Sequence, residues 1–139
     1  MKVLKYILLA LLVTATVSEA SAKRVKKSVF IFGFSASFKD STVYFTDVQE
    51  VKDAWIDTKT KFLLGRDNYS YQLKEYFTTK QGSPNRVCMV FFDKKRKAAE
   101  KQFVKLRKKY TGKKKGGYLI QYLTEQDFKF EPVDMSPDE

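Results

Sequence analysis

A strand–helix–strand pattern in the C-terminal half constrains the fold of this chain more than any other feature. Most positions in residues 95–110 are charged, and the apolar positions recur at intervals of four and three: Ala99, Phe103, Leu106 and Tyr110. That spacing places them on one stripe and predicts an amphipathic helix. Apolar runs flank this helix at 86–92, without alternation, and at 118–123. They predict strands, the first covered on both faces, and a crossover of this length favours parallel neighbours.

The N-terminal half adds strands and a second helix. Residues 28–38 are rich in aromatic and β-branched side chains, and residues 42–46 resume this pattern after a polar break, which predicts a β-hairpin. Residues 47–55 show helical spacing and predict one or two helical turns, capped by Thr46 or Asp47. Residues 69–79 predict a helix whose start Asp67 or Asn68 can cap.

Together these elements predict an α+β fold: a single small domain over residues 28–131, with a four- to five-stranded mixed sheet covered by two main helices. Phe128 to Phe130 can add a short edge strand. We expect a basic disordered lead-in at 23–27 and an acidic mobile tail at 132–139.

The first 22 residues have the organisation of a secretory signal peptide. Lys2 and Lys5 precede a short apolar run, and an Ala-Ser-Ala sequence closes the segment at residue 22. The apolar run is shorter than the roughly 20 residues that a membrane-spanning helix needs. We therefore expect the mature protein to begin at Lys23 and to function in the periplasm or outside the cell.

Histidine is absent and Cys88 is the only cysteine. These counts remove Ser-His-Asp and Cys-His catalysis, the usual zinc sites and an intramolecular disulfide. Cys88 lies in an apolar run and is expected to pack as a small apolar residue. We expect a monomer without metal or cofactor and with no catalytic residue identified, although carboxylate, lysine and tyrosine chemistry remains open.

Positive charge is concentrated in one segment. The chain has a net charge of +11, and residues 94–115 hold twelve basic residues against Glu100. Clustered charge on a helix is what polyanion binding requires, because its affinity comes largely from counterion release. The candidate residues are Lys97, Lys101, Lys105, Arg107, Lys108, Lys113, Lys114 and Lys115. Anionic envelope glycans, lipid headgroups or another exported protein are the expected partners, and sequence-specific nucleic-acid binding is not expected. The alternative is that these charges form an ordinary solvated helix face with no binding role.

A second candidate site lies between residues 47 and 72, where aromatic side chains stand beside carboxylates and amides. A glycan-binding module or a small hydrolase uses such residues, and the candidates are Asp47, Asp57, Arg66, Asp67, Tyr69 and Tyr71. Glycoside hydrolysis would require Asp57 and Asp67 to lie about 5–10 Å apart. The alternative is structural, with Asp67 as a helix cap, Arg66 as its ion partner and Trp55 in the core.

Three segments carry a resemblance: FGFSASFKDSTVYFTD, DAWIDTKTKFLLGRDNYSYQLKEYF and RVCMVFFDKKRKAAEKQFVKLRKKY. Together they resemble small exported proteins of Bacteroidota, which implies an envelope or periplasmic protein and assigns no activity or site residue. Residues 86–123 are also similar in architecture to sporulation-related-repeat domains, which bind peptidoglycan glycan; a second copy of that half-motif is missing here.

Overall fold

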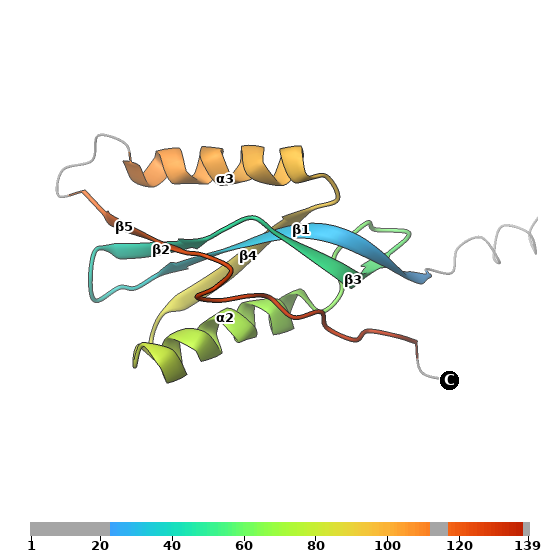
Figure 1. Ribbon diagram of the computed structural model, residues 1–139, viewed down its shortest axis with the longest axis horizontal. Helices are drawn as coiled ribbons and strands as arrows, with labels where there is room; N and C mark the ends of the chain where they lie inside the picture. The colour runs from blue at the N-terminus through green and yellow to red at the C-terminus, as the bar shows by residue number, and fades with distance from the viewer. Residues whose placement is uncertain (1–22, 112–116, 138–139) are drawn as a thin grey trace, which may run out of the picture.

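The computed structural model describes residues 23–111 and 117–137, which form a mixed sheet with one helix on each face (Figure 1). The elements are β1 (Arg24–Ala36), β2 (Thr42–Thr46), β3 (Gln49–Asp57), α2 (Arg66–Lys80), β4 (Val87–Asp93), α3 (Arg96–Thr111) and β5 (Leu119–Leu123). The predicted α+β class, the mixed sheet, its two main helices and the hairpin of β1 and β2 are confirmed.

The central strand is β1, which pairs along both of its edges. Residues 30–36 of β1 pair with β4, and this stretch overlaps the partners of β3 and of β2. Because one edge is thus taken by β4, β2 and β3 share the opposite edge, one after the other. Beyond β2, the sheet continues with β5, which runs parallel to it.

The two helices make the long connections, α2 from β3 to β4 and α3 from β4 to β5. Since β3 and β4 are both antiparallel to β1, they are parallel to each other and lie on either side of it. Parallel strands β4 and β5 lie at opposite edges of the sheet. The crossovers therefore join parallel strands, as predicted, but the expectation that these strands are neighbours is wrong.

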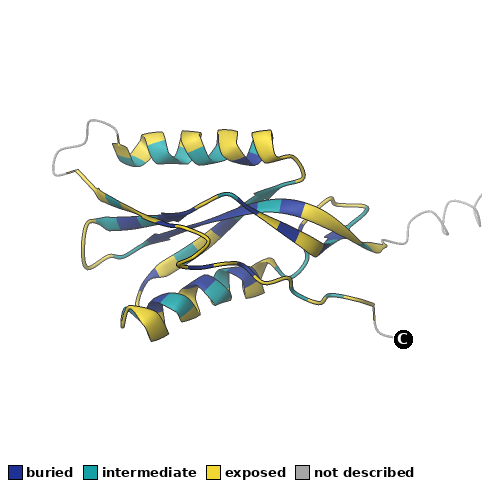
Figure 2. Ribbon diagram, viewed as in Figure 1, coloured by how far each residue is buried: buried dark blue, intermediate teal, exposed yellow. Residues whose placement is uncertain are grey.

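Alternation along β1 builds two apolar layers. Val29 and Ile31 face α2, where they join Tyr69, Leu73 and Phe77 in one buried cluster. On the other face, Phe34 and Phe45 pack against α3 in a second cluster that includes Phe103, Leu106 and Tyr110. Figure 2 shows buried residues along the middle of β1 and on the side of α2 that faces the sheet, whereas the corresponding side of α3 is mostly of intermediate burial. Both faces of the central strand are therefore covered.

The prediction of helical turns at residues 47–55 is wrong, because this segment is strand β3. Its pairing with β1 contains a bulge, at which Lys52 and Asp53 stand opposite a single residue of β1. Asp53 has a φ of 60°, a left-handed conformation that aspartate tolerates. Because the bulge adds one residue, the buried positions Val51 and Ala54 are three apart, and the strand imitates a helical period.

Residues 24–27, predicted as a disordered lead-in, are the first part of β1 and pair with residues 54–57 of β3. Their basic side chains are compatible with a strand because they lie near its solvated end. The prediction that the 86–92 run is covered on both faces holds only for its second half. There Val90 and Phe92 pack in the α2 layer and Phe91 packs in the α3 layer, whereas Val87 and Met89 are each 44% exposed.

Residues 124–135, here called the C-terminal strap, begin with a turn at 125–127 and continue without helix or strand. Contrary to the prediction, Phe128 to Phe130 form no strand. Their backbone is bonded instead by the buried side chain of Gln49, whose Nε2 donates to the Phe128 carbonyl (2.8 Å) and whose Oε1 accepts from the Phe130 N–H (2.9 Å). An amide side chain thus replaces a neighbouring strand, which a local sequence pattern does not reveal.

The strap continues into the segment predicted as a mobile tail. The Val133 N–H donates to the Tyr69 hydroxyl (3.1 Å), and Arg24 Nη1 donates to the Met135 carbonyl (3.0 Å). At least as far as Met135, the tail is therefore bonded to α2 and to β1.

Candidate functional site

Four of the predicted polyanion-binding residues lie together on the exposed face of α3. Lys97, Lys101, Lys105 and Lys108 line a shallow surface that also includes Glu100 and Val104. They come together because the apolar stripe of the helix packs on the sheet, which turns the opposite side to solvent. None of the four lysines forms an ion pair with another residue that the structure describes. We call these four residues the lysine face.

Arg107, a further predicted basic residue, is not part of the lysine face. Arg107 is half-buried, and its guanidinium lies 5.8 Å from the centre of the Phe103 ring. This contact holds Arg107 toward the sheet side of the helix. Lys113, Lys114 and Lys115 lie outside the described residues.

Two candidates for the ligand cleft have structural roles. Tyr69 is fully buried under the C-terminal strap and accepts the Val133 N–H. Asp57 Oδ1 accepts the N–H groups of Lys59 (2.8 Å) and Thr60 (3.1 Å) in the turn after β3. These bonds, that of Thr60 first, hold the pKa of Asp57 below its ordinary value. Asp57 is thus a turn residue rather than the partner of a second carboxylate.

Arg66 and Asp47 also lie apart from a common site. Arg66 Nη2 donates to the Val90 carbonyl of β4 (2.7 Å), and no ion pair joins Arg66 to Asp67 among the described residues. Asp47 is exposed at the junction of β2 and β3, where its N–H donates to the Leu123 carbonyl (3.0 Å). The bond from Arg66 thus caps the open edge of β4, whereas Asp47 belongs to the junction of β2 and β3.

Only Asp67 and Tyr71 of the six cleft candidates line a common groove. The predicted cap is wrong, because α2 begins after Gly65, which has a φ of 74°, and no side chain caps it. Asp67, Tyr71 and Lys74 instead lie one helical turn apart and face the first residues of β4 across a groove of about 550 Å³.

Cys88 lies in the wall of this groove and is half-buried. Burial raises the pKa of its thiol, although its contact with Ser35 Oγ (3.5 Å) and the nearby Arg86 oppose that change. The thiol therefore stays protonated near neutral pH, which does not favour a nucleophilic role.

Arg86 lies between this groove and a smaller pocket, and sequence reasoning missed it. Its side chain is 5% exposed, and its guanidinium lies 4.8 Å from the centre of the Tyr44 ring. The smaller pocket, here called the Arg86 pocket, has a volume of about 190 Å³ and is lined by Ser37, Lys39, Asp40, Gly82, Ser83, Pro84, Asn85 and Arg86. In sequence, Arg86 is only the polar residue before an apolar run, so no local signal marks it.

The described residues contain no cluster of three or more acidic or cysteine side chains that could hold a metal ion. None of the helices in the described ranges is long and apolar enough to cross a membrane. Comparison with protein-family models, with curated proteins and with solved structures found no match.

Proposed function

We propose that this protein is exported and that it binds a polyanion of the cell envelope or the extracellular space through the lysine face, without catalysis. The observation that carries the proposal is the gathering of Lys97, Lys101, Lys105 and Lys108 on one exposed helix face without ion-pair partners among the described residues. Charges arranged in this way displace counterions from a polyanion, and that release drives binding.

The spacing of the lysines lowers the stability of α3 when no ligand is bound. Lys101 lies four residues from Lys97 and from Lys105, and Lys105 lies three residues from Lys108. Each such like-charge pair destabilises a helix by roughly 0.2–0.5 kcal/mol. A bound polyanion removes this repulsion, so ligand binding and helix stability are coupled.

The shape of the surface favours a polymer over a small molecule. The lysine face is shallow and belongs to one helix, with Val104 exposed among the lysine stems. Such a surface cannot enclose a ligand, whereas pockets for small molecules bury most of the ligand's surface. An extended chain of repeating negative groups can instead contact several lysines at once.

The organisation of residues 1–22 supports export, and the composition supports a role in binding. The chain lacks histidine, and burial raises the pKa of its one thiol. The alternative, a glycan-binding module or hydrolase between residues 47 and 72, is supported less well because Asp57 belongs to a turn and Tyr69 to the core.

The proposal is tested by measuring binding of the chain from Lys23 onward to heparin and to vesicles with anionic lipid, at about 50 and 200 mM salt. The test variant carries Lys101→Gln, Lys105→Gln and Lys108→Gln. The matched control carries Lys52→Gln, Lys61→Gln and Lys80→Gln, exposed lysines outside α3 that change the net charge equally.

We expect salt-sensitive binding that the α3 variant loses and the control variant retains. With duplex DNA as a calibrated polyanion, each lysine that contacts a phosphate contributes about 0.9 to the slope of log K against log salt. The α3 variant should therefore lower that slope by about 2 to 3. Equal losses in both variants, or no binding by the unmodified chain at low salt, would overturn the proposal.

A further inference from the structure

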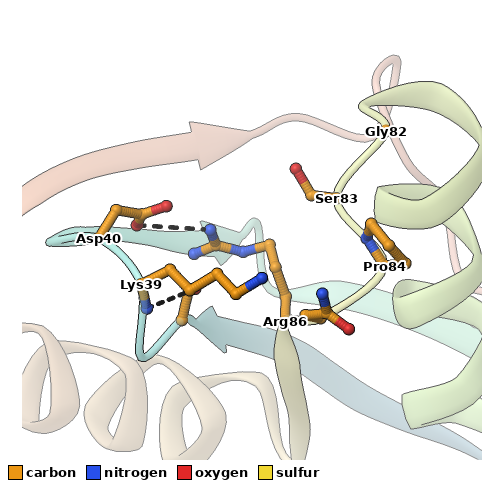
Figure 3. A pocket seen from close by; sticks show the side chains of 8 residues that line it. Lys39, Asp40, Gly82, Ser83, Pro84 and Arg86 are labelled. Atoms are coloured by element: carbon orange, nitrogen blue, oxygen red, sulfur yellow. Dashed lines mark hydrogen bonds and ion pairs between the residues drawn. The ribbon is translucent and has the colours of Figure 1, made fainter.

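We propose that the Arg86 pocket is a second binding site, which takes a single oxyanion group of a small ligand: a carboxylate, a phosphate or a sulfate. This inference is independent of the lysine face. In Figure 3 the Arg86 guanidinium lies between the turn of β1 and β2, which carries Lys39 and Asp40, and the loop after α2, which carries Ser83 and Pro84. Two separate stretches of the chain, residues 37–40 and 82–86, thus form one small cavity.

The guanidinium of Arg86 is held rigidly on one side. Its Nε donates to Ser35 Oγ (3.0 Å), and its Nη2 donates to the carbonyls of Thr42 (2.6 Å) and Ser35 (3.4 Å). The plane of the group lies near the rings of Tyr44 and Phe77, with distances to the ring centres of 4.8 and 5.3 Å. Because these contacts fix the group before a ligand arrives, little side-chain entropy is lost on binding.

The other end of the guanidinium is open. Nη1 makes no hydrogen bond with another described residue and has only a loose ion pair with Asp40 Oδ1 at 3.7 Å. The part of the chain that the structure describes holds no buried side-chain nitrogen or oxygen without a hydrogen-bond partner, so Nη1 is accessible. Nη1 is therefore the part of this fixed cation that can still donate a hydrogen bond at the pocket.

The remaining lining groups suit an oxyanion. Lys39 supplies a second cation, and the hydroxyl of Ser37 and the amide of Asn85 supply neutral donors, whereas the Ser83 hydroxyl already donates to the Gln81 carbonyl (3.4 Å). A volume of about 190 Å³ equals the share of about six water molecules in the liquid. The cavity is thus large enough for one anionic group and too small for a drug-sized ligand.

Asp40 is the group in the pocket that opposes an anion, and it provides the sharpest test. Its Oδ1 accepts the Thr42 N–H (2.9 Å), so the carboxylate is held in the turn beside Arg86. Asp40→Asn keeps an oxygen for this bond and removes the negative charge. An anion should therefore bind more tightly to this variant, a gain that damage to the fold would not produce.

The experiment titrates inorganic phosphate, sulfate and acetate, in separate arms at constant ionic strength, into the isotope-labelled chain. It follows the NMR signals of the Arg86 Nε–H and of the backbone amides of Lys39, Ser83 and Asn85. We expect saturable shifts at these positions with at least one of the three anions, and the tightest of them identifies the anionic group. Lys61→Gln, outside the pocket, serves as the charge control for Lys39→Gln.

Asp40→Asn should tighten binding by about two- to fivefold, and Lys39→Gln should weaken it by a similar factor, as for partly exposed charge pairs. Lys61→Gln should leave it unchanged. Absence of saturable shifts with all three anions overturns the inference, as does an unchanged affinity in Asp40→Asn. The α3 triple variant should still bind the anion, so failure of the lysine face and failure of this pocket are distinguishable.

Discussion

Gly33 is the residue at which the α2 layer approaches β1 too closely for a side chain. A Cβ built there would lie 2.6 Å from Leu73 Cδ2 and 3.2 Å from Phe130 Cζ. We expect Gly33→Ala to lower the free energy of unfolding by about 1–3 kcal/mol, because overpacking displaces neighbours in a dense core. Urea denaturation measures this loss. Combined with Leu73→Ala, the substitution should cost less than the sum of the two single changes, whereas strict additivity would contradict the steric explanation.

Gln49 and Gln72 make the same reciprocal pair of bonds to the C-terminal strap but differ in burial. Gln49 is buried and bonds Phe128 and Phe130, whereas Gln72 bonds both backbone groups of Glu131 near solvent (2.9 and 2.8 Å). We expect Gln49→Ala to destabilise the protein by about 2–4 kcal/mol, since it leaves a buried N–H and a buried carbonyl unpaired.

Gln72→Ala is the matched control for Gln49→Ala. Water can replace its bonds, so we expect a loss of only about 0.5–1 kcal/mol. The two free energies of unfolding come from urea denaturation, and hydrogen exchange at the Phe130 amide should quicken in the Gln49 variant. Equal losses in the free energy of unfolding would mean that burial does not decide how much each glutamine contributes to stability.

Repulsion between neighbouring lysines destabilises helix α3. Lys105 has like-charged neighbours at Lys101, Lys108 and Lys109. We expect Lys105→Gln to raise the free energy of unfolding by roughly 0.6–1.5 kcal/mol at low salt, because it removes three unfavourable pairs. Thermal unfolding at low and high salt measures the change, and the gain should disappear at high salt. Lys52→Gln in β3 serves as the control and should show no such gain.

Elements with a local signature could be predicted from the sequence, and the others could not. The apolar stripe of α3 fixed both its helical state and the face on which Lys97, Lys101, Lys105 and Lys108 lie. The bulge in β3 changed the spacing of its buried positions and hid the strand. The strap could not be predicted from local sequence, because its backbone forms hydrogen bonds with the side chain of Gln49, which is far away in the sequence.

The same reasoning explains the candidate sites. The lysine face belongs to one helix, so helical periodicity alone places its members. The Arg86 pocket joins a turn at residues 37–40 to a loop at residues 82–86, and only the paired strands bring these together. No spacing within either segment marks the pocket.

For the whole molecule, we expect stability to fall at alkaline pH. Burial raises the pKa of Cys88 above 9.0 and that of Tyr69 above 10.0, their ordinary values. The unfolded chain therefore loses these protons first, so stability is fully present below about pH 9 and falls as the pH rises through these values. Urea denaturation from neutral pH to beyond pH 10 measures the slope.

Tyr69→Phe and Cys88→Ala isolate the two groups. Each variant lacks one titrating proton and should show a shallower loss of stability with pH than the unmodified protein, whatever its stability at neutral pH. A slope unchanged in both variants would show that other groups cause the alkaline loss.

The central place of β1 has a consequence for the order of folding. This strand is made first, yet it pairs with β2, β3 and β4 and has apolar residues on both of its faces. Its last contacts come from the strap, which closes over the α2 side at Phe130. Such distant pairings slow folding, because a long loop must be ordered before they form. A chain emerging from the ribosome therefore completes neither apolar layer early, because the α2 layer needs Phe128 and Phe130 and the α3 layer needs Phe103 and Tyr110.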